Sequence, residues 1–362
     1  MMRSCDALIV GGGPAGSSCA RALRLAGWNV VVLDRARFPR DKVCGGWVTP
    51  GVFRALELDP AEYRATGLVL QEITGFRTSV IGQSAVETTY ATVVSYAIRR
   101  CEFDNFLLCR AQVCVLHNRP LATLRRERDR WIVNDEIESP VVIGAGGHFC
   151  PVARQFQGER DQLDPVIAKE AEFLLNGNGS SVDQRMPELF FCRDLEGYAW
   201  CVRKGNYLNV GIGRRPHEGF ADHLRDFARF LSATGRVGRS SAITWRGHAY
   251  HARGAGVRPL VAHGVLIVGD AAGLAYPESG EGIRPAVESG LLAARTLIAG
   301  DGRFARDALQ PYERAMHAAH RPSALTPKPL APMVKALGRT LLRSRAFTRH
   351  VMLDRWFLRS AQ

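Results

Sequence analysis

The sequence predicts an α/β fold whose parallel sheet is assembled from separated parts of the chain. Four short apolar runs are typical of strands buried on both faces of such a sheet: 7–10, 29–33, 141–143 and 265–268. Segments 67–80 and 85–97, and four segments between 166 and 213, instead read as strands of a second, mainly antiparallel sheet. Residues 113–143 are expected to form an antiparallel strand set. The antiparallel domain is therefore expected as an insertion, and a helical segment is expected at the C-terminus.

The first apolar strand leads directly into Gly11-x-Gly13-x-x-Gly16 and a helix-forming run that ends at Leu25. In this pattern the first glycine allows a tight turn, the second lets the backbone approach a pyrophosphate, and the third lets helix and strand pack closely. The second strand ends at Asp34, whose carboxylate can accept a hydrogen bond from a ribose hydroxyl. A helix N-terminus also offers free N–H groups to phosphate. Together these features predict a Rossmann-like, dinucleotide-binding domain.

The composition is that of an ordinary globular protein. The 362 residues are 46% hydrophobic and 23% charged, enough for two closely joined domains. No run of 18 apolar residues predicts a membrane-spanning helix, and the first strand starts too early for a signal peptide. Nine cysteines without CxxC pairs predict free thiols, a cytoplasmic location and no metal site.

The net charge of +13 is concentrated at the C-terminus. Residues 321–362 hold nine basic residues and one acidic residue, a net charge of +8. Because no nucleic-acid-binding motif is present, an anionic membrane surface is favoured over nucleic acid as a partner. Two helical patterns in this segment place apolar residues on one face: Met333, Val334, Leu337 and Leu341, then Phe347, Val351, Met352 and Trp356. The alternative is that these helices dock on the protein and leave a basic outer face.

Five motifs together resemble the geranylgeranyl reductase family of FAD proteins, which has a glutathione-reductase-type fold like that of para-hydroxybenzoate hydroxylase. They are the Gly11–Gly16 pattern with Asp34, Lys42-Val43-Cys44-Gly45-Gly46, Arg99-Arg100-x-x-Phe103-Asp104, Gly197-Tyr198-Ala199-Trp200, and Gly269-Asp270 continuing to Gly280-Glu281-Gly282-Ile283. Two motifs depart from the family. Cys201-Val202-Arg203 replaces the usual Phe-Pro after Trp200, and Ala145-Gly146-Gly147 lacks the usual aspartate. Both departures concern the substrate side more than the cofactor.

The resemblance implies that FAD is the cofactor. The residues expected to contact it are Gly11, Gly13, Pro14, Ala15, Gly16, Asp34, Arg35, Cys44, Gly45, Gly46, Arg100, Gly269, Asp270, Gly280, Gly282 and Ile283. Arginine is unfavourable at a helix start, so Arg99 and Arg100 suggest a contact with cofactor phosphates or with a neighbouring carboxylate. A surface salt bridge is the alternative for Arg100.

Cys44, Tyr198 and Trp200 are the candidates on the substrate side. Tyr198 and Trp200 alternate in a strand and so share one face, where they line a substrate pocket or pack in the core. Cys44 and Tyr198 are candidate proton donors to substrate, and the alternative for Cys44 is a packing role beside the flavin.

These expectations define domains and a reaction. The FAD-binding domain is expected over 1–66, 98–160 and 255–310, the substrate domain over 67–97 and 161–254, and the basic segment over 311–362. The expected reaction is reduction of carbon–carbon double bonds in a polyprenyl lipid, with hydride from N5 of reduced flavin. Because only one nucleotide fingerprint is present, NADPH would visit transiently or another reductant would supply electrons. The alternatives are an FAD monooxygenase of an aromatic or other apolar molecule, and a flavoprotein that binds lipid or a partner without turnover. No oligomeric state is predicted.

Overall fold

A computed structural model describes residues 2–157, 165–175, 180–215, 218–238, 243–250, 258–319 and 337–359. The chain forms two compact units. Unit 1 comprises Met1–Asp41, Cys101–Leu163 and Tyr250–Ser323, and unit 2 comprises Lys42–Arg100, Asp164–Ala249 and Ala324–Gln362. Compared with the expected domains, residues 42–66 lie in unit 2, and the C-terminal segment is divided between the units.

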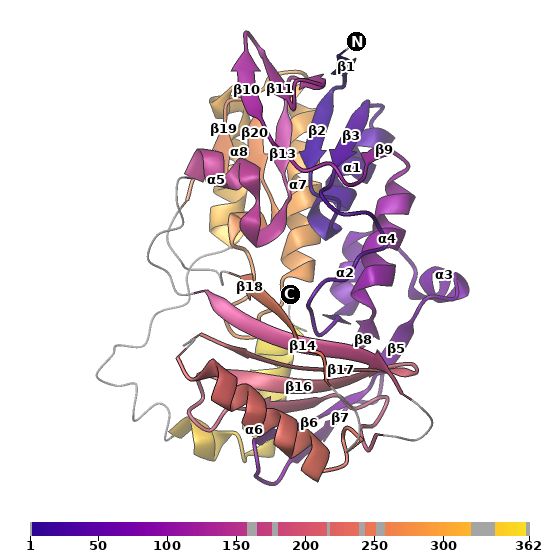
Figure 1. The fold of residues 1–362 in the computed structure, drawn as a ribbon, viewed down its shortest axis with the longest axis vertical. Helices are drawn as coiled ribbons and strands as arrows, with labels where there is room; N and C mark the ends of the chain where they lie inside the picture. The colour runs from indigo at the N-terminus through magenta and orange to yellow at the C-terminus, as the bar shows by residue number, and fades with distance from the viewer. Residues whose placement is uncertain are drawn as a thin grey trace. The chain divides into compact units, whose positions relative to one another are not determined.

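Unit 1 contains a six-stranded sheet in the order β19-β20-β13-β2-β3-β9 (Figure 1). Five of its strands run parallel: β20 (Val265–Ile267), β13 (Val142–Gly144), β2 (Ala7–Val10), β3 (Val30–Leu33) and β9 (Cys114–Leu116). The edge strand β19 (Val261–Ala262) is antiparallel to β20. The discontinuous parallel sheet is thus confirmed. The expectation that the strands of 113–143 form one antiparallel set was wrong for β9, which pairs in parallel with β3 through Val31 and Cys114.

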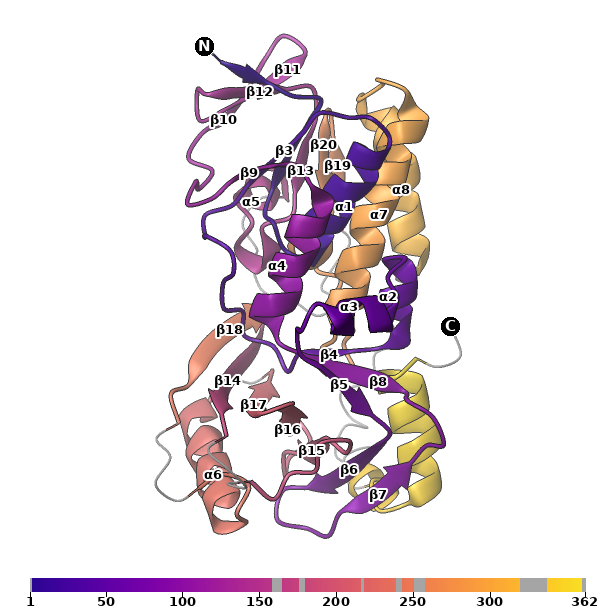
Figure 2. The ribbon, with the colours of Figure 1, turned by 90° about the vertical axis from the view of Figure 1, so that its right-hand side faces the viewer.

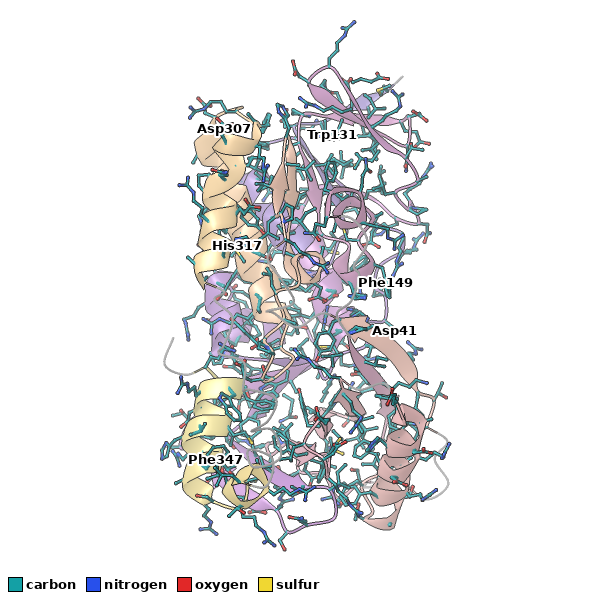
Figure 3. The ribbon with its side chains drawn as sticks, turned by 90° about the vertical axis from the view of Figure 1, so that its left-hand side faces the viewer. Asp41, Trp131, Phe149, Asp307, His317 and Phe347 are labelled. Atoms are coloured by element: carbon teal, nitrogen blue, oxygen red, sulfur yellow. The ribbon has the colours of Figure 1, made fainter. Side chains whose placement is uncertain are left out.

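Alternation along the strands gives the parallel sheet two buried faces. On β2, Ala7 and Ile9 pack with the helices, whereas Leu8 and Val10 pack on the opposite side. The helical layer contains α1 (Pro14–Leu25), α4 (Arg100–Ala111), α7 (Ile283–Gly300) and α8 (Arg306–Ala319). Figure 3 labels Asp307 and His317 on α8.

The opposite face is covered by a four-stranded sheet and by α5 (Pro151–Gln157). The sheet order is β1 (Arg3–Ser4), β12 (Ile137–Ser139), β11 (Arg130–Val133) and β10 (Leu124–Glu127). Trp131 of β11, labelled in Figure 3, is buried in this layer. Two short 3-10 turns, η1 (Gly147–Phe149) and η2 (Gly269–Ala272), follow β13 and β20.

Unit 2 is built on a seven-stranded sheet. Its order is β18 (Arg246–Tyr250), β14 (Val166–Leu174), β17 (Tyr207–Arg214), β16 (Gly197–Lys204), β15 (Glu188–Phe191), β6 (Gly75–Val80) and β7 (Val86–Thr89). The pairing is mainly antiparallel, as expected, although β15 is parallel to β6. A three-stranded sheet joins β4 (Trp47–Val48), β8 (Ser95–Ile98) and β5 (Leu70–Ile73), so segments 67–80 and 85–97 are shared between two sheets. Two short helices, α2 (Pro50–Ala55) and α3 (Pro60–Ala65), complete the unit's N-terminal part.

Helices lie on both faces of the seven-stranded sheet. One face packs against α6 (Phe220–Ala233), through a cluster that includes Phe190 and Phe227. The other face packs against η4 (Phe347–Phe357), a helix with π-type hydrogen bonding. Figure 2 shows this helix in yellow beside β6 and β7, and Figure 3 labels Phe347 on it.

The C-terminal helix uses its apolar side inside unit 2. Met352, Leu353 and Phe357 are buried in the same cluster as Phe76 and Trp200. Tyr90 of the adjoining segment donates a 2.7 Å hydrogen bond to Asp354. The docked arrangement therefore describes this helix. Arg349 and Arg355 are exposed on it, and Arg343 and Arg345 are exposed just before it. Of the preceding helical pattern, Met333 and Val334 lie outside the described residues. Among the residues described, no helix combines the length and apolar character needed to cross a bilayer.

Candidate functional site

The turn between β2 and α1 requires glycine at two of its predicted positions. Gly11 has φ +116°, and a β-carbon there would overlap the carbonyl oxygen of Ala145. A β-carbon on Gly16 would overlap the carbonyl oxygen of Gly11. Gly13 is the N-cap of α1, and Pro14 and Ala15 form its first turn. The glycine pattern thus places the N-terminus of α1 at the carboxyl end of β2, where its free N–H groups favour an anion.

Asp34 fixes the two loops that border this turn. Its Oδ2 accepts a 2.7 Å hydrogen bond from the Gly12 N–H, and its Oδ1 accepts one of 2.8 Å from Ala36. The side chain is 8% exposed, so the carboxylate is held at the end of β3 in one orientation. The neighbouring Arg35 is exposed. Each carboxylate oxygen retains a second lone pair for a ribose hydroxyl.

A further cation stands beside the same turn. Arg40 Nη1 lies 3.3 Å from Asp104 Oδ2, and Asp104 is completely buried. The Arg40 side chain also covers the Phe38 ring, with 4.6 Å between the guanidinium carbon and the ring centroid. Its Nη2 lies 3.4 Å from where a β-carbon on Gly13 would stand. The buried carboxylate therefore holds a guanidinium at the N-terminus of α1.

The second cofactor motif packs onto the first turn of α1. Gly269 has φ +64°, and a β-carbon there would lie 3.0 Å from Ala15 Cβ. Gly290 of α7 approaches still closer, since a β-carbon on it would overlap the Ala15 carbonyl. Asp270 Oδ1 lies 2.9 Å from the position of a β-carbon on Gly282, which is the N-cap of α7. Unit 1 thus brings Asp270 to the turn that starts α7 at Ile283.

Gly280 precedes that turn with φ +68°. A β-carbon on it would overlap the hydroxyl of Tyr250. The Gly280–Gly282 backbone is therefore closely covered by Tyr250 on this side, while Asp270 lies against the N-cap residue Gly282.

In unit 2, the Cys44-Gly45-Gly46 segment lies on one face of the seven-stranded sheet. The Cys44 N–H donates a 2.6 Å hydrogen bond to Glu170 Oε2. The Cys44 carbonyl accepts from Asn209 Nδ2 at 3.4 Å, and the Gly46 N–H points to the Cys44 sulfur at 3.3 Å. Both polar backbone groups of Cys44 are therefore held by side chains of β14 and β17.

The two glycines of this segment each face a side chain of β16. A β-carbon on Gly45 would stand 3.4 Å from Trp200 Nε1. Gly46 has φ +65°, and a β-carbon there would overlap the carbonyl of Ile98 and stand 2.5 Å from Lys204 Nζ. A side chain at position 46 would therefore be resisted, whereas a β-carbon at position 45 would be in ordinary contact with Trp200.

A charged cluster adjoins Cys44 on the same sheet face. Glu172 accepts hydrogen bonds from Lys204 Nζ at 2.7 Å and from Arg99 Nε at 2.9 Å. Lys204 is completely buried. Burial opposes ionisation of Glu172, but Lys204 and Arg99 outweigh it and hold the pKa of Glu172 below its usual range. Arg99 therefore contacts a neighbouring carboxylate, which is one of the two contacts expected from its position at the start of the helix.

Glu170 behaves differently because its hydrogen-bond donors are neutral. It is 6% exposed and accepts from the Cys44 N–H and from Asn209 Nδ2, at 2.6 and 3.3 Å. Burial raises the pKa of Glu170 to about 7, against the opposing effects of Lys204, Cys44 and Asn209. This carboxyl group consequently titrates near neutral pH.

Tyr198 and Trp200 share one sheet face, as their spacing predicts. Their ring centroids are 6.0 Å apart, and Tyr198 meets Phe357 of η4 edge-to-face at 5.5 Å. Trp200 is 9% exposed and donates from Nε1 to Asn209 Oδ1 at 2.7 Å. Both side chains belong to the hydrophobic cluster under the C-terminal helix. The structure thus shows Tyr198 and Trp200 packed in this cluster, and the lining of a substrate pocket stays a prediction.

Comparison with known proteins identifies the cofactor chemistry. The model of the family described as FAD dependent oxidoreductase matches residues 6–96, which contain the Gly11–Gly16 turn and Asp34. The chain is an FAD-dependent oxidoreductase. The digeranylgeranylglycerophospholipid reductase of Methanocaldococcus jannaschii is 26% identical to it over 285 residues, which cover 74% of this chain and 70% of that protein.

Solved structures share the fold of the oxidoreductase. A geranylgeranyl bacteriochlorophyll reductase-like protein of Thermoplasma acidophilum is 21% identical, with a TM-score of 0.74, and the match covers 94% of this chain and 88% of that one. The flavin-dependent halogenase CmlS is 20% identical, with a TM-score of 0.69, over 94% of this chain and 72% of that one. The expected α/β fold with a Rossmann-like FAD-binding domain is thereby confirmed.

The residues of unit 1 fit FAD. A backbone cradle at Gly11 and Gly16 that a β-carbon would fill, a helix N-terminus and the Asp34 carboxylate are suited to a pyrophosphate and a ribose. The predicted contacts that unit 1 brings together are Gly11, Gly13, Pro14, Ala15, Gly16, Asp34, Gly269, Asp270, Gly282 and Ile283. Four others belong to unit 2, namely Cys44, Gly45, Gly46 and Arg100, the last of which is buried at the start of α4.

Sequence reasoning missed several residues of the oxidoreductase that the structure places at these sites. Arg40 and Asp104 are 64 positions apart, so their pairing is not visible in the sequence. The sequence contained a weak signal for Glu170 and Glu172. They are the second and fourth residues after the buried Ala168, so all three side chains lie on the same face of β14. Charged side chains at inward-facing strand positions are rarely buried without partners, and this pattern favours a functional or paired group.

Proposed function

We propose that this oxidoreductase reduces carbon–carbon double bonds in a polyprenyl, geranylgeranyl-type lipid. The observation that carries the proposal is the coexistence of an FAD cradle in unit 1 with the Cys-Gly-Gly and Tyr-x-Trp motifs on one sheet face of unit 2. The relative of Methanocaldococcus jannaschii named a digeranylgeranylglycerophospholipid reductase supports this substrate class.

Each part of the proposed site has a task. When bound, FAD supplies a hydride from reduced N5 to one alkene carbon. A proton for the neighbouring carbon comes from Cys44, Tyr198 or water, so the double bond becomes a single bond. Tyr198 and Trp200 present an apolar surface that orients the chain and excludes water. NADPH or another two-electron reductant restores the reduced cofactor after each turnover.

A single experiment tests the reaction. The purified protein with FAD is reduced without oxygen and then mixed with a geranylgeranyl lipid, while flavin absorbance and product mass are followed. The proposal predicts reoxidation of the flavin together with a product two mass units heavier for each double bond reduced. If no prenyl lipid reoxidises the flavin, the proposal fails.

The second candidate is oxygen-dependent chemistry, either hydroxylation or a related reaction, on an aromatic or other apolar small molecule. The similarity of the fold to that of a flavin-dependent halogenase supports this candidate. It predicts that substrate stimulates NAD(P)H consumption only in the presence of oxygen. The anaerobic experiment therefore separates the two candidates.

We also propose that the basic C-terminal segment rests on an anionic membrane surface, which would bring the protein to a lipid substrate. The apolar side of η4 is buried, and exposed arginines at 343, 345 and 355 lie on its outer side and just before it. The contact would accordingly be electrostatic and sensitive to salt. This arrangement corresponds to a peripheral protein in the cytoplasm.

A further inference from the structure

A cleft of about 340 Å³ opens on the surface of unit 2. It lies where the turn between β6 and β7, the turn between β15 and β16, and the segment before the C-terminal helix come together; Figure 2 shows these strands and, in yellow, that helix. Its lining residues are Val80, Ile81, Gly82, Gln83, Arg193 and Arg339. Among the residues described, the lining therefore has two guanidinium groups, one amide and no acidic side chain.

The Arg339 guanidinium is fixed to the protein by one edge. Its Nε donates a 3.0 Å hydrogen bond to the Arg193 carbonyl, and its Nη2 donates to the same oxygen. The preceding Gly338 packs on the same turn, since a β-carbon on it would stand 3.1 Å from Leu195 Cδ1. A guanidinium has five N–H donors, so Nη1 and the second N–H of Nη2 remain for a ligand.

The Arg193 guanidinium lies over the turn between β6 and β7. Its Nη2 is 3.6 Å from the position of a β-carbon on Gly82. The adjacent Asp194 does not neutralise it, because the two Asp194 oxygens accept hydrogen bonds from Arg214 at 3.1 and 2.8 Å. Within the described part of the chain, neither Arg193 nor Arg339 forms an ion pair with a carboxylate. The cleft thus presents two uncompensated cations.

This charge distribution suits a phosphate group. Arginine binds phosphate through parallel N–H···O hydrogen bonds, and two guanidinium groups offer more donors than one carboxylate could accept. A phosphomonoester carries about −1.5 to −2 charges at pH 7 and has three acceptor oxygens. A phosphodiester has one charge and two unesterified oxygens. The monoester is therefore the better complement to the two arginines.

An exposed leucine beside the cleft indicates that the ligand also has an apolar part. Leu337 stands two positions before Arg339, and its side chain is 59% exposed. The floor of the cleft adds the buried Val80 and the half-buried Ile81. Free phosphate makes no use of apolar surface, whereas a phosphate that heads a lipid continues into acyl chains that Leu337 can contact.

We propose that this cleft binds the phosphomonoester headgroup of an anionic lipid of the phosphatidic acid type, with Arg193 and Arg339 on the phosphate and Leu337 against the lipid chains. The inference deepens the membrane contact proposed above and rests on it for its place in the cell. That contact requires only positive charge, whereas the cleft selects one headgroup. The proposal does not depend on the reduction reaction.

The test is isothermal titration calorimetry of the full-length, FAD-loaded protein with three probes: dihexanoylphosphatidic acid, dihexanoylphosphatidylglycerol and inorganic phosphate. Both lipids are kept monomeric, so no membrane surface is present. Phosphatidic acid should saturate one site, about tenfold more tightly than either other probe, since phosphatidylglycerol offers one charge and inorganic phosphate no apolar contact. Equal affinity for inorganic phosphate would assign the cleft to a soluble phosphate compound and overturn the lipid proposal. Absence of saturable phosphatidic acid binding would also overturn it.

Variants of the two arginines locate the site. Arg193→Gln should weaken phosphatidic acid binding about tenfold, and its fold should be intact because the Arg193 side chain is exposed. Arg193→Lys keeps the charge but loses the paired donors, so it should lie between Arg193→Gln and the wild type. The matched control is Arg215→Gln, at an exposed position outside the cleft, which should stay within about twofold of the wild type. Equal losses in Arg193→Gln and Arg215→Gln would contradict a defined site.

Cosedimentation with vesicles then separates the cleft from the broader membrane contact. Calorimetric binding of phosphatidic acid that requires Arg193, without vesicle binding, would remove the membrane contact and leave the site. Vesicle binding together with a calorimetric response indifferent to Arg193 and Arg339 would overturn the site and leave the contact.

Discussion

Arg40 Nη1 lies 3.3 Å from the completely buried Asp104 Oδ2, and this ion pair holds a guanidinium beside Gly13 at the N-terminus of α1. The Arg40 side chain is 22% exposed, so its outer edge is open to a ligand while its inner edge is fixed. A cation held in this way stabilises a pyrophosphate without a further entropic cost for ordering the side chain.

The first prediction concerns this cation. Arg40→Gln should weaken FAD binding about tenfold, because one charge-assisted hydrogen bond to phosphate is lost. Titration of the apoprotein with FAD, followed by flavin fluorescence, measures the effect. The matched control is Arg37→Gln, at an exposed position of the same loop, which should leave the affinity within about twofold. Equal affinities for wild type and Arg40→Gln would refute this contact.

The second prediction compares two glycines of one helix. Gly290→Ala should lower the free energy of unfolding by about 2–3 kcal/mol, because its β-carbon would overlap the Ala15 carbonyl and force α1 and α7 apart. Gly300→Ala, at the last position of the same helix, should not lower it and should raise it by up to about 1 kcal/mol, since nothing lies within 4 Å of a β-carbon there and alanine is the better helix former. Urea unfolding of the two variants provides the measurement, and similar midpoints would contradict the close approach of α1 and α7.

The third prediction follows from the raised pKa of Glu170. In the folded protein the pKa of Glu170 is raised from its ordinary 4.5 to about 7, so between these values the folded state binds more protons than the unfolded state. The free energy of unfolding should therefore fall as pH rises from 4.5 to 7, by about 3 kcal/mol from this group. In Glu170→Gln this contribution should disappear, whereas Glu62→Gln should keep it. Urea unfolding at pH 5 and pH 7.5 tests this, and an identical pH dependence in wild type and Glu170→Gln would exclude it.

The fourth prediction separates the two candidate proton donors. Cys44→Ala or Tyr198→Phe should slow the transfer from reduced flavin to a prenyl lipid about a hundredfold if that residue gives the proton. Reduction of the flavin by its donor should be unaffected, because the proton is needed only at the substrate. Single-turnover absorbance measures both steps. If both variants react at the wild-type rate, water is the donor.

The fifth prediction addresses the basic surface. Replacing the exposed Arg343, Arg345 and Arg355 with Gln should reduce binding to vesicles that contain phosphatidylserine by about a hundredfold or more, at about 1 kcal/mol for each charge. Cosedimentation at low salt measures binding. Replacing three exposed arginines elsewhere, Arg119, Arg225 and Arg229, removes the same charge and should have a much smaller effect. Equal losses of vesicle binding in the two triple variants would indicate that net charge, and not a defined surface, determines the binding.

Local patterns were enough to predict the first half of the cofactor site. The Gly11–Gly16 pattern and Asp34 are close in sequence, and their geometry follows from one strand, one turn and one helix. The strand spacing likewise placed Tyr198 and Trp200 on one face. In contrast, β9 was assigned to the wrong sheet, because a short strand carries no local signal for its partner.

The α/β class, the nucleotide-binding turn and the alternation of the antiparallel strands could be predicted from the amino-acid sequence, since these depend on neighbouring residues and on periods of two and 3.6. Three contacts became visible only in the folded protein. Asp104 holds Arg40, Glu170 and Asn209 hold the backbone of Cys44, and the apolar side of the C-terminal helix packs in one cluster with Phe76 and Trp200. Each of these contacts joins residues far apart in the chain. Their partners are chosen by burial and charge in the folded protein, which no local pattern records.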